Sequence, residues 1–129
     1  MKKLFLGLFA TALLASSTQA GEFADISVKD VNQLSAAKTA VILDVNGDES
    51  YKAGHVPGAL NYNAIKNDLG AKLPRQKDAL IIAYCGSPKC GAYLKAAKAA
   101  QKLGYTNIKH MSAGISGWKA AGLKTEPGA

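Results

Sequence analysis

The sequence predicts an α/β fold built on a mainly parallel sheet, because short apolar runs alternate with helical segments along the chain. Two of these runs, 39–45 and 79–84, are apolar on both faces. Such runs are typical of strands that lie inside a parallel sheet between two layers of helices. Glycines and prolines at turn positions separate the runs from the helical segments, so one sheet flanked by helices is expected.

Residues 1–20 have the pattern of a secretory signal peptide. Two lysines precede an apolar stretch at 4–15, and Thr-Gln-Ala at 18–20 is a small-residue cleavage site. The apolar stretch is shorter than the roughly 20 residues that a membrane-spanning helix needs. We therefore expect a cleaved leader, no stable membrane anchor and a periplasmic location. Residues 21–129 are enough for one compact domain and too few for two.

The charge pattern argues against a nucleic-acid partner. The formal net charge is +7, but the lysines are spread along the chain and Arg75 is the only arginine. Bidentate contacts to bases and phosphates rely on arginine, so nucleic acid is not expected to bind. The excess of positive charge favours small anions instead.

The elements before residue 79 follow from a cap, an apolar strand and a rigid turn. Ser27 has the side chain of a helix N-cap, and apolar residues recur after it at helical spacing. Asn-Gly-Asp at 46–48 breaks a strand, and Pro57 fixes a turn between two glycines. The predicted elements are an edge strand at 22–26, a helix ending near 37, a strand at 39–45, a short helix at 49–53, a strand at 59–62 and helical pieces over 63–73.

The elements after residue 79 centre on a strand, a loop and a helix. The strand at 79–84 runs into Cys85-Gly-Ser-Pro-Lys-Cys90, and lysines 95, 98 and 102 then mark one face of an amphipathic helix. Gly104 supplies the stop. The predicted elements are a strand at 79–84, a helix at 91–103, a strand at 105–111, a turn at 112–114, a short helix at 115–121 and a loose tail at 122–129.

Both cysteines lie in the loop between that strand and helix. Unpaired backbone N–H groups and the positive end of the helix dipole meet where Cys85 sits, and they favour anions and lower a thiol pKa. In an oxidising compartment Cys85 and Cys90 can form a disulfide. A bridge around so short a loop stabilises a fold little, so a chemical role explains the pair better.

Four motifs occur along the chain after the leader. They are Ile42-Leu-Asp-Val45, Tyr51-Lys-Ala-Gly-His-Val-Pro-Gly-Ala59, Tyr84-Cys85 and Ala113-Gly-Ile-Ser-Gly-Trp118. In this order and spacing, they resemble a single-domain rhodanese, a sulfurtransferase, and the resemblance covers nearly all of the chain after the leader. It implies a rhodanese-like three-layer fold, with a central, mostly parallel five-stranded sheet flanked by helices.

The resemblance also assigns the chemistry of the loop. Cys85 would accept a sulfane sulfur as a persulfide and pass it to a thiophilic acceptor, since a thiolate attacks the outer sulfur of a donor such as thiosulfate or a polysulfide. Backbone amides of the loop, except that of Pro88, would hold the anionic sulfur. The predicted substrate-binding residues are Gly86, Ser87, Lys89, Cys90 and Gly91.

The loop departs from the family pattern. Many members have a glycine and an arginine where this chain has Pro88 and Lys89, followed here by Cys90. Lys89 either neutralises an anionic donor or is a solvated surface lysine, and Ser87 either donates to the same anion or caps the coming helix. The related phosphatases have a longer loop followed by an arginine, whereas the residue six beyond Cys85 is Gly91, so phosphatase activity is not expected.

Cys90 has two interpretations. It either acts as a resolving thiol that attacks the persulfide on Cys85, releasing reduced sulfur and forming a disulfide, or packs at the start of the helix without chemistry. His55 precedes a proline turn and matches a structural position of the family, so it is not expected to act as a general base. His110 has no second histidine, carboxylate or cysteine at ligand spacing, so it does not predict a metal site. No metal and no organic cofactor is expected. Asp44 is interpreted as a cap of the turn after its strand and Trp118 as packing.

These observations favour a periplasmic sulfurtransferase of rhodanese type. Its partners would be a small sulfur-containing anion, a thiol or cyanide-like acceptor, and a periplasmic thiol. Two alternatives remain open. One is a thiol–disulfide oxidoreductase or redox sensor that uses Cys85 and Cys90, and the other is a non-catalytic module that binds sulfur or anions.

Overall fold

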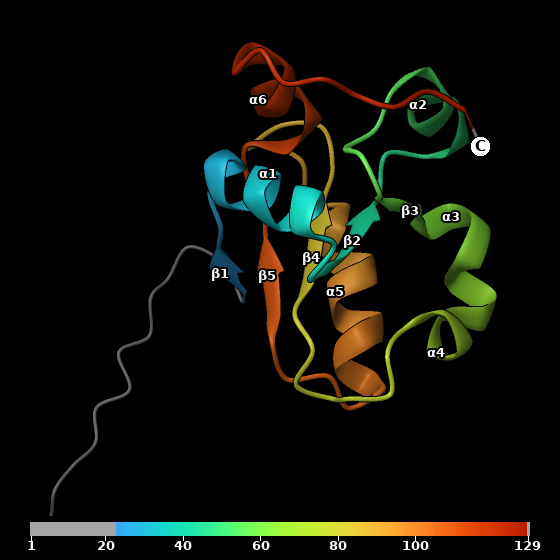
Figure 1. Cartoon of the computed structure of the whole chain (residues 1–129). Coiled ribbons are helices and arrows are strands. Elements are labelled where there is room, and N and C mark those ends of the chain that lie inside the picture. The colour runs from blue at the N-terminus through green and yellow to red at the C-terminus, as the bar shows by residue number, and fades with distance from the viewer. Residues whose placement is uncertain (1–22, 129) are drawn as a thin grey trace, which may run out of the picture.

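The computed structural model describes residues 23–128, which form a five-stranded sheet between helices (Figure 1). The strands lie in the order β1-β5-β4-β2-β3, and each neighbouring pair is parallel. This confirms the α/β class and the five-stranded parallel sheet. The predicted signal peptide, 1–20, lies outside the described residues. The strands are β1 (Ala24–Asp25), β2 (Val41–Asp44), β3 (Leu60–Asn61), β4 (Ile81–Tyr84) and β5 (Ile108–His110).

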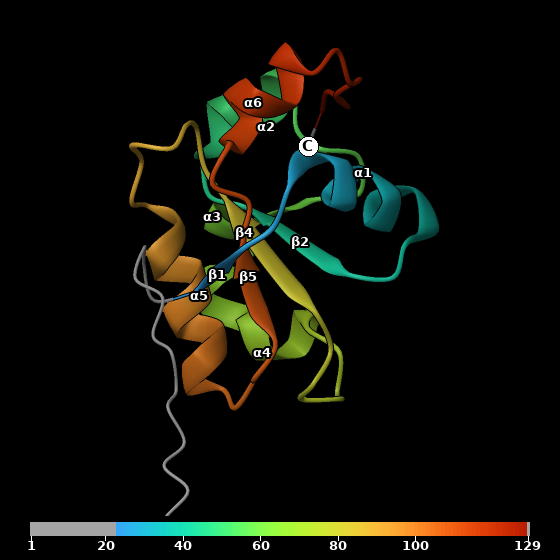
Figure 2. The same ribbon diagram turned by 90° about the vertical axis from the view of Figure 1, so that its left-hand side faces the viewer.

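The helices cover both faces of the sheet and its carboxyl edge. In Figure 2, α5 lies on one side of the sheet and α1 on the other, while α2 and α6 lie beyond the ends of the strands. No helix within residues 23–128 is long and apolar enough to cross a membrane. The helices are α1 (Val28–Ala37), α2 (Asp48–Ala53), α3 (Tyr62–Ile65), the 3-10 helix η1 (Lys66–Asp68), α4 (Leu69–Lys72), α5 (Tyr93–Lys102) and α6 (Gly114–Ala120).

The central strand β4 divides the core into two clusters. Successive side chains of a strand point to opposite faces. Ile81 and Ala83 therefore join the cluster that contains the buried residues of α5, and Cys85 continues the same alternation. Ile82 and Tyr84 join the cluster on the other face, which contains Val31 of α1 and Trp118 of α6. The alternation thus directs Cys85 towards the α5 side of the sheet.

Helix α1 begins and ends as its sequence predicts. The Ser27 side chain accepts a hydrogen bond from the backbone N–H of Asp30 at 3.0 Å, which confirms the predicted N-cap. The helix ends at Ala37, and Lys38 follows in the left-handed conformation with φ 58°. Val31 is fully buried and anchors the helix on the sheet.

The prediction of a loose tail at 122–129 is wrong for the residues that the structure describes. Glu126 pairs with His55 through two backbone hydrogen bonds of 2.8 and 2.9 Å, and the N–H of Gly128 donates to the carbonyl of Lys52. The indole N–H of Trp118 donates to the carbonyl of Lys124 at 2.9 Å. These contacts join residues far apart in sequence, and the tail has no apolar periodicity that would signal them.

Candidate active site

Cys85 lies at the carboxyl end of the central strand, and only 1% of its surface is exposed. Strand β4 is hydrogen-bonded to β2 on one side and β5 on the other. The carboxyl edge of a parallel sheet is where α/β proteins form their ligand sites, since the loops that leave the strands meet there. Cys85 therefore has the most central position at this edge.

The start of α6 holds the first residues of the loop. The backbone N–H of Ile115 donates to the carbonyl of Cys85 at 2.9 Å, and that of Ser116 donates to the carbonyl of Gly86 at 3.0 Å. N–H groups in the first turn of a helix have no partner within the helix, so they are free to make these bonds. The motif at 113–118 thus positions the backbone that carries Cys85.

Gly114 allows this close approach. Its φ is +66°, and a Cβ built on it would lie 2.6 Å from the carbonyl carbon of Gly86 and 2.7 Å from the carbonyl oxygen of Cys85. A side chain at this position would therefore push the loop away from α6. The requirement for glycine is both conformational and steric.

The structure joins Cys85 and Cys90 in a disulfide, with their Cα atoms 6.3 Å apart. The loop between them turns tightly, because the N–H of Cys90 donates to the carbonyl of Ser87 at 3.0 Å. Cys90 is half-buried, so the disulfide bridges the buried end of the strand and the partly exposed end of the loop. In this state neither sulfur is a thiolate.

The other predicted site residues line the same loop. Gly86 and Ser87 are half-buried, whereas Lys89 and Gly91 are exposed. Helix α5 begins later than predicted, at Tyr93, and its N-cap is Ala92 with no side-chain hydrogen bond, so Ser87 does not cap it. The other interpretation of Ser87, a hydrogen bond to a bound anion, stays a prediction, as do the roles of the remaining loop residues.

A buried hydrogen-bond network that the sequence analysis missed supports the loop from the opposite face. The hydroxyl of Tyr84 donates to Oδ2 of Asp44 at 2.5 Å and accepts from the N–H of Val56 at 3.0 Å. Burial, and then the negative charge of Asp44, raises the pKa of Tyr84 far above its usual value. Oδ1 of Asp44 accepts from the N–H of Asn46 at 2.8 Å, which confirms Asp44 as the cap of the turn.

The two histidines lie in different surroundings. His55 is buried between the tail and α2, with Nδ1 donating to the carbonyl of Tyr51 and Nε2 3.6 Å from Oε2 of Glu126. His110 is 8% exposed and stacks on Tyr93 with ring centroids 3.3 Å apart. Burial lowers the pKa of His110, and the nearby charge of Asp25 opposes this effect. Residues 23–128 contain no group of three or more His, Cys, Asp or Glu side chains suited to a metal ion.

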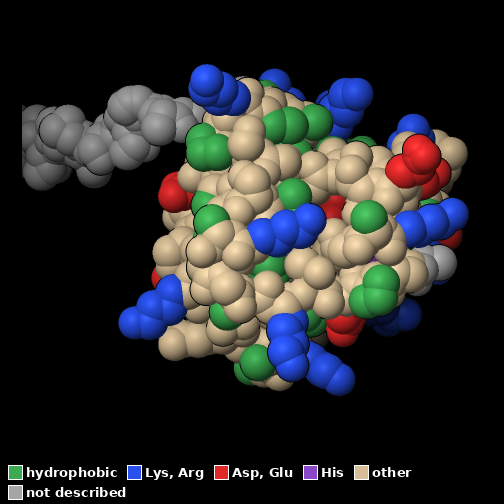
Figure 3. Space-filling view, turned by 90° about the horizontal axis from the view of Figure 1, so that it is seen from above, with side chains coloured by type: hydrophobic (Ala, Val, Ile, Leu, Met, Phe, Trp, Pro, Cys, Tyr) green, Lys and Arg blue, Asp and Glu red, His purple; other side chains and the backbone are tan. Residues whose placement is uncertain are grey.

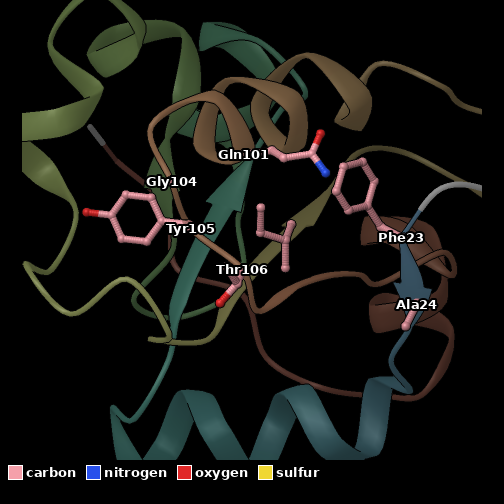
Figure 4. Close-up of a pocket in the computed structure, with 7 residues that line it drawn as sticks. Phe23, Ala24, Gln101, Gly104, Tyr105 and Thr106 are labelled. Carbon is pink, nitrogen blue, oxygen red and sulfur yellow. The ribbon is translucent and has the colours of Figure 1, made fainter.

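A cavity of about 460 Å³ lies at the opposite edge of the sheet, away from the cysteines (Figure 4). Its walls come from the segment before β5, the end of α5 and the start of the described chain, and no residue of the 85–91 loop lines it. It is therefore not the sulfur site. The lining residues are Phe23, Ala24, Gln101, Gly104, Tyr105, Thr106 and Ile108.

Known proteins share both the sequence and the fold. The rhodanese-like domain matches residues 27–121. The chain is 34% identical over 94 residues to the HTH-type transcriptional regulator Rv0324 of Mycobacterium tuberculosis, with 72% of this chain and 40% of the regulator aligned. It thus spans well under half the length of that relative.

Two further similarities involve proteins closer to this chain in length. Thiosulfate sulfurtransferase GlpE of Pseudoalteromonas translucida is 29% identical over 103 residues, with 77% of this chain and 91% of the relative aligned. The crystal structure of the BH2092 protein of Bacillus halodurans superposes with a TM-score of 0.63 at 25% identity, covering 81% of this chain and 77% of that one. With the family match over most of the described fold, these similarities show that the chain belongs to the rhodanese-like domain family and is homologous to sulfurtransferases.

Proposed function

We propose that this protein is a sulfurtransferase that moves a sulfane sulfur from a small anionic donor to a thiophilic acceptor through a persulfide on Cys85. The observation that carries the proposal is the position of Cys85, at the carboxyl end of the central strand and at the first position of the loop. Homology to a thiosulfate sulfurtransferase supports thiosulfate as a donor, and a polysulfide has the same reactive sulfur.

The proposed reaction begins with reduction of the disulfide, for which a dithiol supplies two electrons. The Cys85 thiolate then attacks the outer sulfur of thiosulfate. A new S–S bond forms on Cys85, the S–S bond of thiosulfate breaks, and its electron pair leaves with sulfite. In the second half, an acceptor thiolate attacks the outer sulfur of the persulfide, and the electron pair of the broken bond returns to Cys85.

The loop backbone supports the anionic states of this reaction. Backbone N–H groups around a loop stabilise a thiolate, a bound thiosulfate and the outer sulfur of a persulfide, since all three are negative. Pro88 lacks such a group, and Lys89 lies beside it on the exposed rim. We assign donor binding to Gly86, Ser87, Lys89, Cys90 and Gly91.

The Cys85–Cys90 disulfide favours a second candidate function, thiol–disulfide exchange coupled to sulfur reduction. In this version the Cys90 thiolate attacks the inner sulfur of the Cys85 persulfide. The bond to the outer sulfur breaks, hydrosulfide leaves with the electron pair, and the disulfide forms. The sulfane sulfur is reduced, the cysteine pair is oxidised, and a dithiol restores it.

The proposal extends to location. We propose that residues 1–20 direct export, that residues 21–129 act in the periplasm, and that a periplasmic thiol protein supplies the reducing equivalents. The pattern of residues 1–20 and the location of both cysteines in one loop support this.

Intact-mass measurement after incubation of the reduced protein with thiosulfate tests the proposed function. The wild type and Cys90→Ser should each gain one sulfur atom, and Cys85→Ser should gain none, because only Cys85 is the carrier. On addition of a monothiol acceptor, Cys90→Ser should return to its original mass without forming an internal disulfide.

The same set of variants separates the two candidates. If the loaded wild type releases hydrosulfide without any acceptor and Cys90→Ser does not, the resolving role of Cys90 is established. Absence of sulfur on reduced Cys90→Ser, which has no resolving thiol, would contradict the sulfurtransferase function, and sulfur on Cys85→Ser would contradict the choice of carrier.

A further inference from the structure

A second cavity, of about 530 Å³, opens beside the active loop at the carboxyl edge of the sheet. Its walls come from the segment after β2, from α3 and η1, and from the start of α5. The view from above in Figure 3 shows this edge of the molecule, with basic side chains scattered around it. The lining residues are Val45, Asn46, Gly47, Tyr62, Asn63, Lys66, Ala92 and Lys95, and we name this cavity the lysine pocket.

The lysine pocket lies next to the loop that carries Cys85. Asn46 in its wall has Oδ1 3.5 Å from the point where a Cβ on Gly86 would lie. The N–H of Val45 donates to the carbonyl of Tyr84 at 2.9 Å, so this wall is tied to the strand end that precedes Cys85. Ala92, at the end of the loop, forms the other side. The pocket therefore borders the segments on both sides of the 85–91 loop, although no residue of that loop lines it.

The pocket combines positive charge with an apolar wall. Lys66 comes from η1 and Lys95 from α5, both are exposed, and neither has a salt bridge within residues 23–128. Tyr62 links the two sides, since its hydroxyl donates to the carbonyl of Lys95 at 3.4 Å. Together with Val45 and Ala92, the Tyr62 ring supplies carbon surface between the two cations.

One carboxylate, that of Asp48, lies near the pocket without lining it. Its Oδ1 accepts hydrogen bonds from the side-chain amides of Asn61 at 2.9 Å and Asn63 at 3.1 Å. These two hydrogen bonds, and more weakly the charges of Lys52 and Lys66, lower the pKa of Asp48. Asp48 thus offsets part of the positive charge of Lys66.

We propose that the lysine pocket binds the carboxylate of a low-molecular-weight acceptor thiol, with Lys66 and Lys95 as its specificity-determining residues. The proposal rests on the sulfurtransferase function proposed above. The volume is in the range of pockets that bind small organic ligands and exceeds what thiosulfate alone needs. Two cations from different elements, together with apolar lining residues, match a carboxylate at the end of a carbon chain.

The position of the pocket relates this binding to the transfer step. With its carboxylate held at the lysines, the acceptor extends its thiolate towards the persulfide on Cys85. The thiolate attacks the outer sulfur, a new S–S bond forms on the acceptor, and the electron pair of the broken bond leaves on Cys85. Binding of the carboxylate at the lysines holds the acceptor near Cys85, so less entropy is lost when the two sulfur atoms meet in the transfer step.

Steady-state kinetics with a matched pair of acceptors test the proposal. Thiosulfate is the donor, and the acceptors are mercaptopropionate, which carries a carboxylate, and mercaptoethanol, which does not. Lys66→Gln and Lys95→Gln should each raise the ratio of KM for mercaptopropionate to KM for mercaptoethanol about five-fold, as expected for the loss of one charge contact of about 1 kcal/mol. The double variant, which loses both contacts, should raise this ratio by more than about ten-fold.

Lys102→Gln is the matched control, because it removes the same charge from α5 two turns further along, outside the pocket. Its KM ratio should stay within about two-fold of the wild type, as for a surface charge without a contact. A KM ratio that does not change in Lys66→Gln and Lys95→Gln would overturn the proposal. An equal change in Lys102→Gln would also overturn it, since the general field of the protein would then explain the preference for the carboxylate.

A binding experiment separates this inference from the proposed function. Cys85→Ser carries no sulfur, so titration with methylthiopropionate, an unreactive carboxylate, reports the pocket alone. Amide NMR shifts should change around Asn46, Tyr62 and Ala92, and these changes should weaken in the Lys66→Gln/Lys95→Gln background. If the shift changes do not depend on the lysines, or if no shifts change at the pocket, the proposal that the pocket binds a carboxylate is wrong. That conclusion would hold even if the wild type loads sulfur from thiosulfate.

Discussion

At the scale of single residues, the environments of similar side chains differ more than the sequence suggests. Tyr84 and Tyr51 are both buried, but Tyr84 donates to a buried carboxylate and Tyr51 donates to the backbone carbonyl of Ala59. His110 has no hydrogen-bond partner for Nε2 within the described residues and stacks on Tyr93. Its environment therefore favours the neutral ring, which gives the fold a dependence on pH.

The lowered pKa of His110 predicts that stability falls in acid. The unfolded chain binds a proton near the ordinary pKa of 6.5, whereas the folded chain binds it only at lower pH. This contribution to stability is thus complete above the unfolded pKa and is lost as the pH falls from that value through the lower folded pKa. His110→Phe keeps an aromatic ring against Tyr93, so its free energy of unfolding, measured by urea denaturation, should decline less between about pH 7.5 and about pH 5.5, one unit either side of an ordinary histidine pKa.

The control for this experiment is the comparison of the two proteins at pH values above 7. There the residue at position 110 is neutral in both the wild type and His110→Phe, so their free energies of unfolding should change with pH in parallel. Equal slopes for the wild type and His110→Phe across the acid range would show that His110 is not the group responsible.

At the scale of elements, the loop is held by a helix that is distant in sequence. The carbonyls of Cys85 and Gly86 accept hydrogen bonds from backbone N–H groups in the first turn of α6. Gly114, which has no side chain, lets the helix come close enough to the loop to make them. The turn after β2 also approaches the loop, with Oδ1 of Asn46 3.5 Å from the point where a Cβ on Gly86 would lie. The position of the nucleophile therefore depends on three elements that meet at the carboxyl edge of the sheet.

Gly114→Ala should displace the loop and destabilise the fold. The new Cβ meets backbone atoms at 2.6 and 2.7 Å, and the φ of +66° adds strain. Overpacking and a left-handed alanine together should lower the free energy of unfolding by about 3 kcal/mol. The rate of sulfur loading from thiosulfate should also fall, because the carbonyls of residues 85 and 86 lose their donors.

Gly122→Ala is the matched control, because its φ is +78° and a Cβ there meets nothing within 4 Å. This substitution should cost only the conformational term, about 1 kcal/mol, and leave sulfur loading at the wild-type rate. Equal losses in the two variants would mean that the approach of α6 to the loop has no special importance.

At the scale of the whole molecule, the C-terminal residues close the fold over α2 and α6. Glu126 bridges His55, and Lys124 satisfies the indole N–H of Trp118, which is 1% exposed. The tail thus joins both helices at the carboxyl edge, and these two helices border the elements that carry the loop (Figure 1). Removal of the tail tests how much these contacts contribute to the stability of the fold.

Truncation after Leu123 should lower the free energy of unfolding by about 2 kcal/mol, because a buried donor and a pair of backbone groups lose their partners. Thermal and urea unfolding would measure this. Glu126→Gln keeps the backbone pairing, so it should cost less than about 1 kcal/mol, as for an exposed ion pair. A truncated chain as stable as the full one would show that the tail contributes nothing to the fold.

Much of this architecture is readable from local sequence. The all-apolar strand at 79–84 and the glycine and proline breakers indicate a parallel sheet, because strands covered on both faces need apolar residues at every position. The Ser27 cap and the turn cap at Asp44 are confirmed because such hydrogen bonds are local. The same pattern places Cys85 at the end of a central strand.

The sequence by itself determined the fold class, the family and the central position of Cys85, because each rests on apolar runs or short motifs that can be recognised without knowing which elements are in contact. The tertiary structure alone decided the Tyr84–Asp44 bond, the approach of α6 to the loop, the docking of the tail and the lysine pocket. Each of these joins residues from separate elements. Such contacts depend on how the strands are ordered and where the helices pack, and no local periodicity records that.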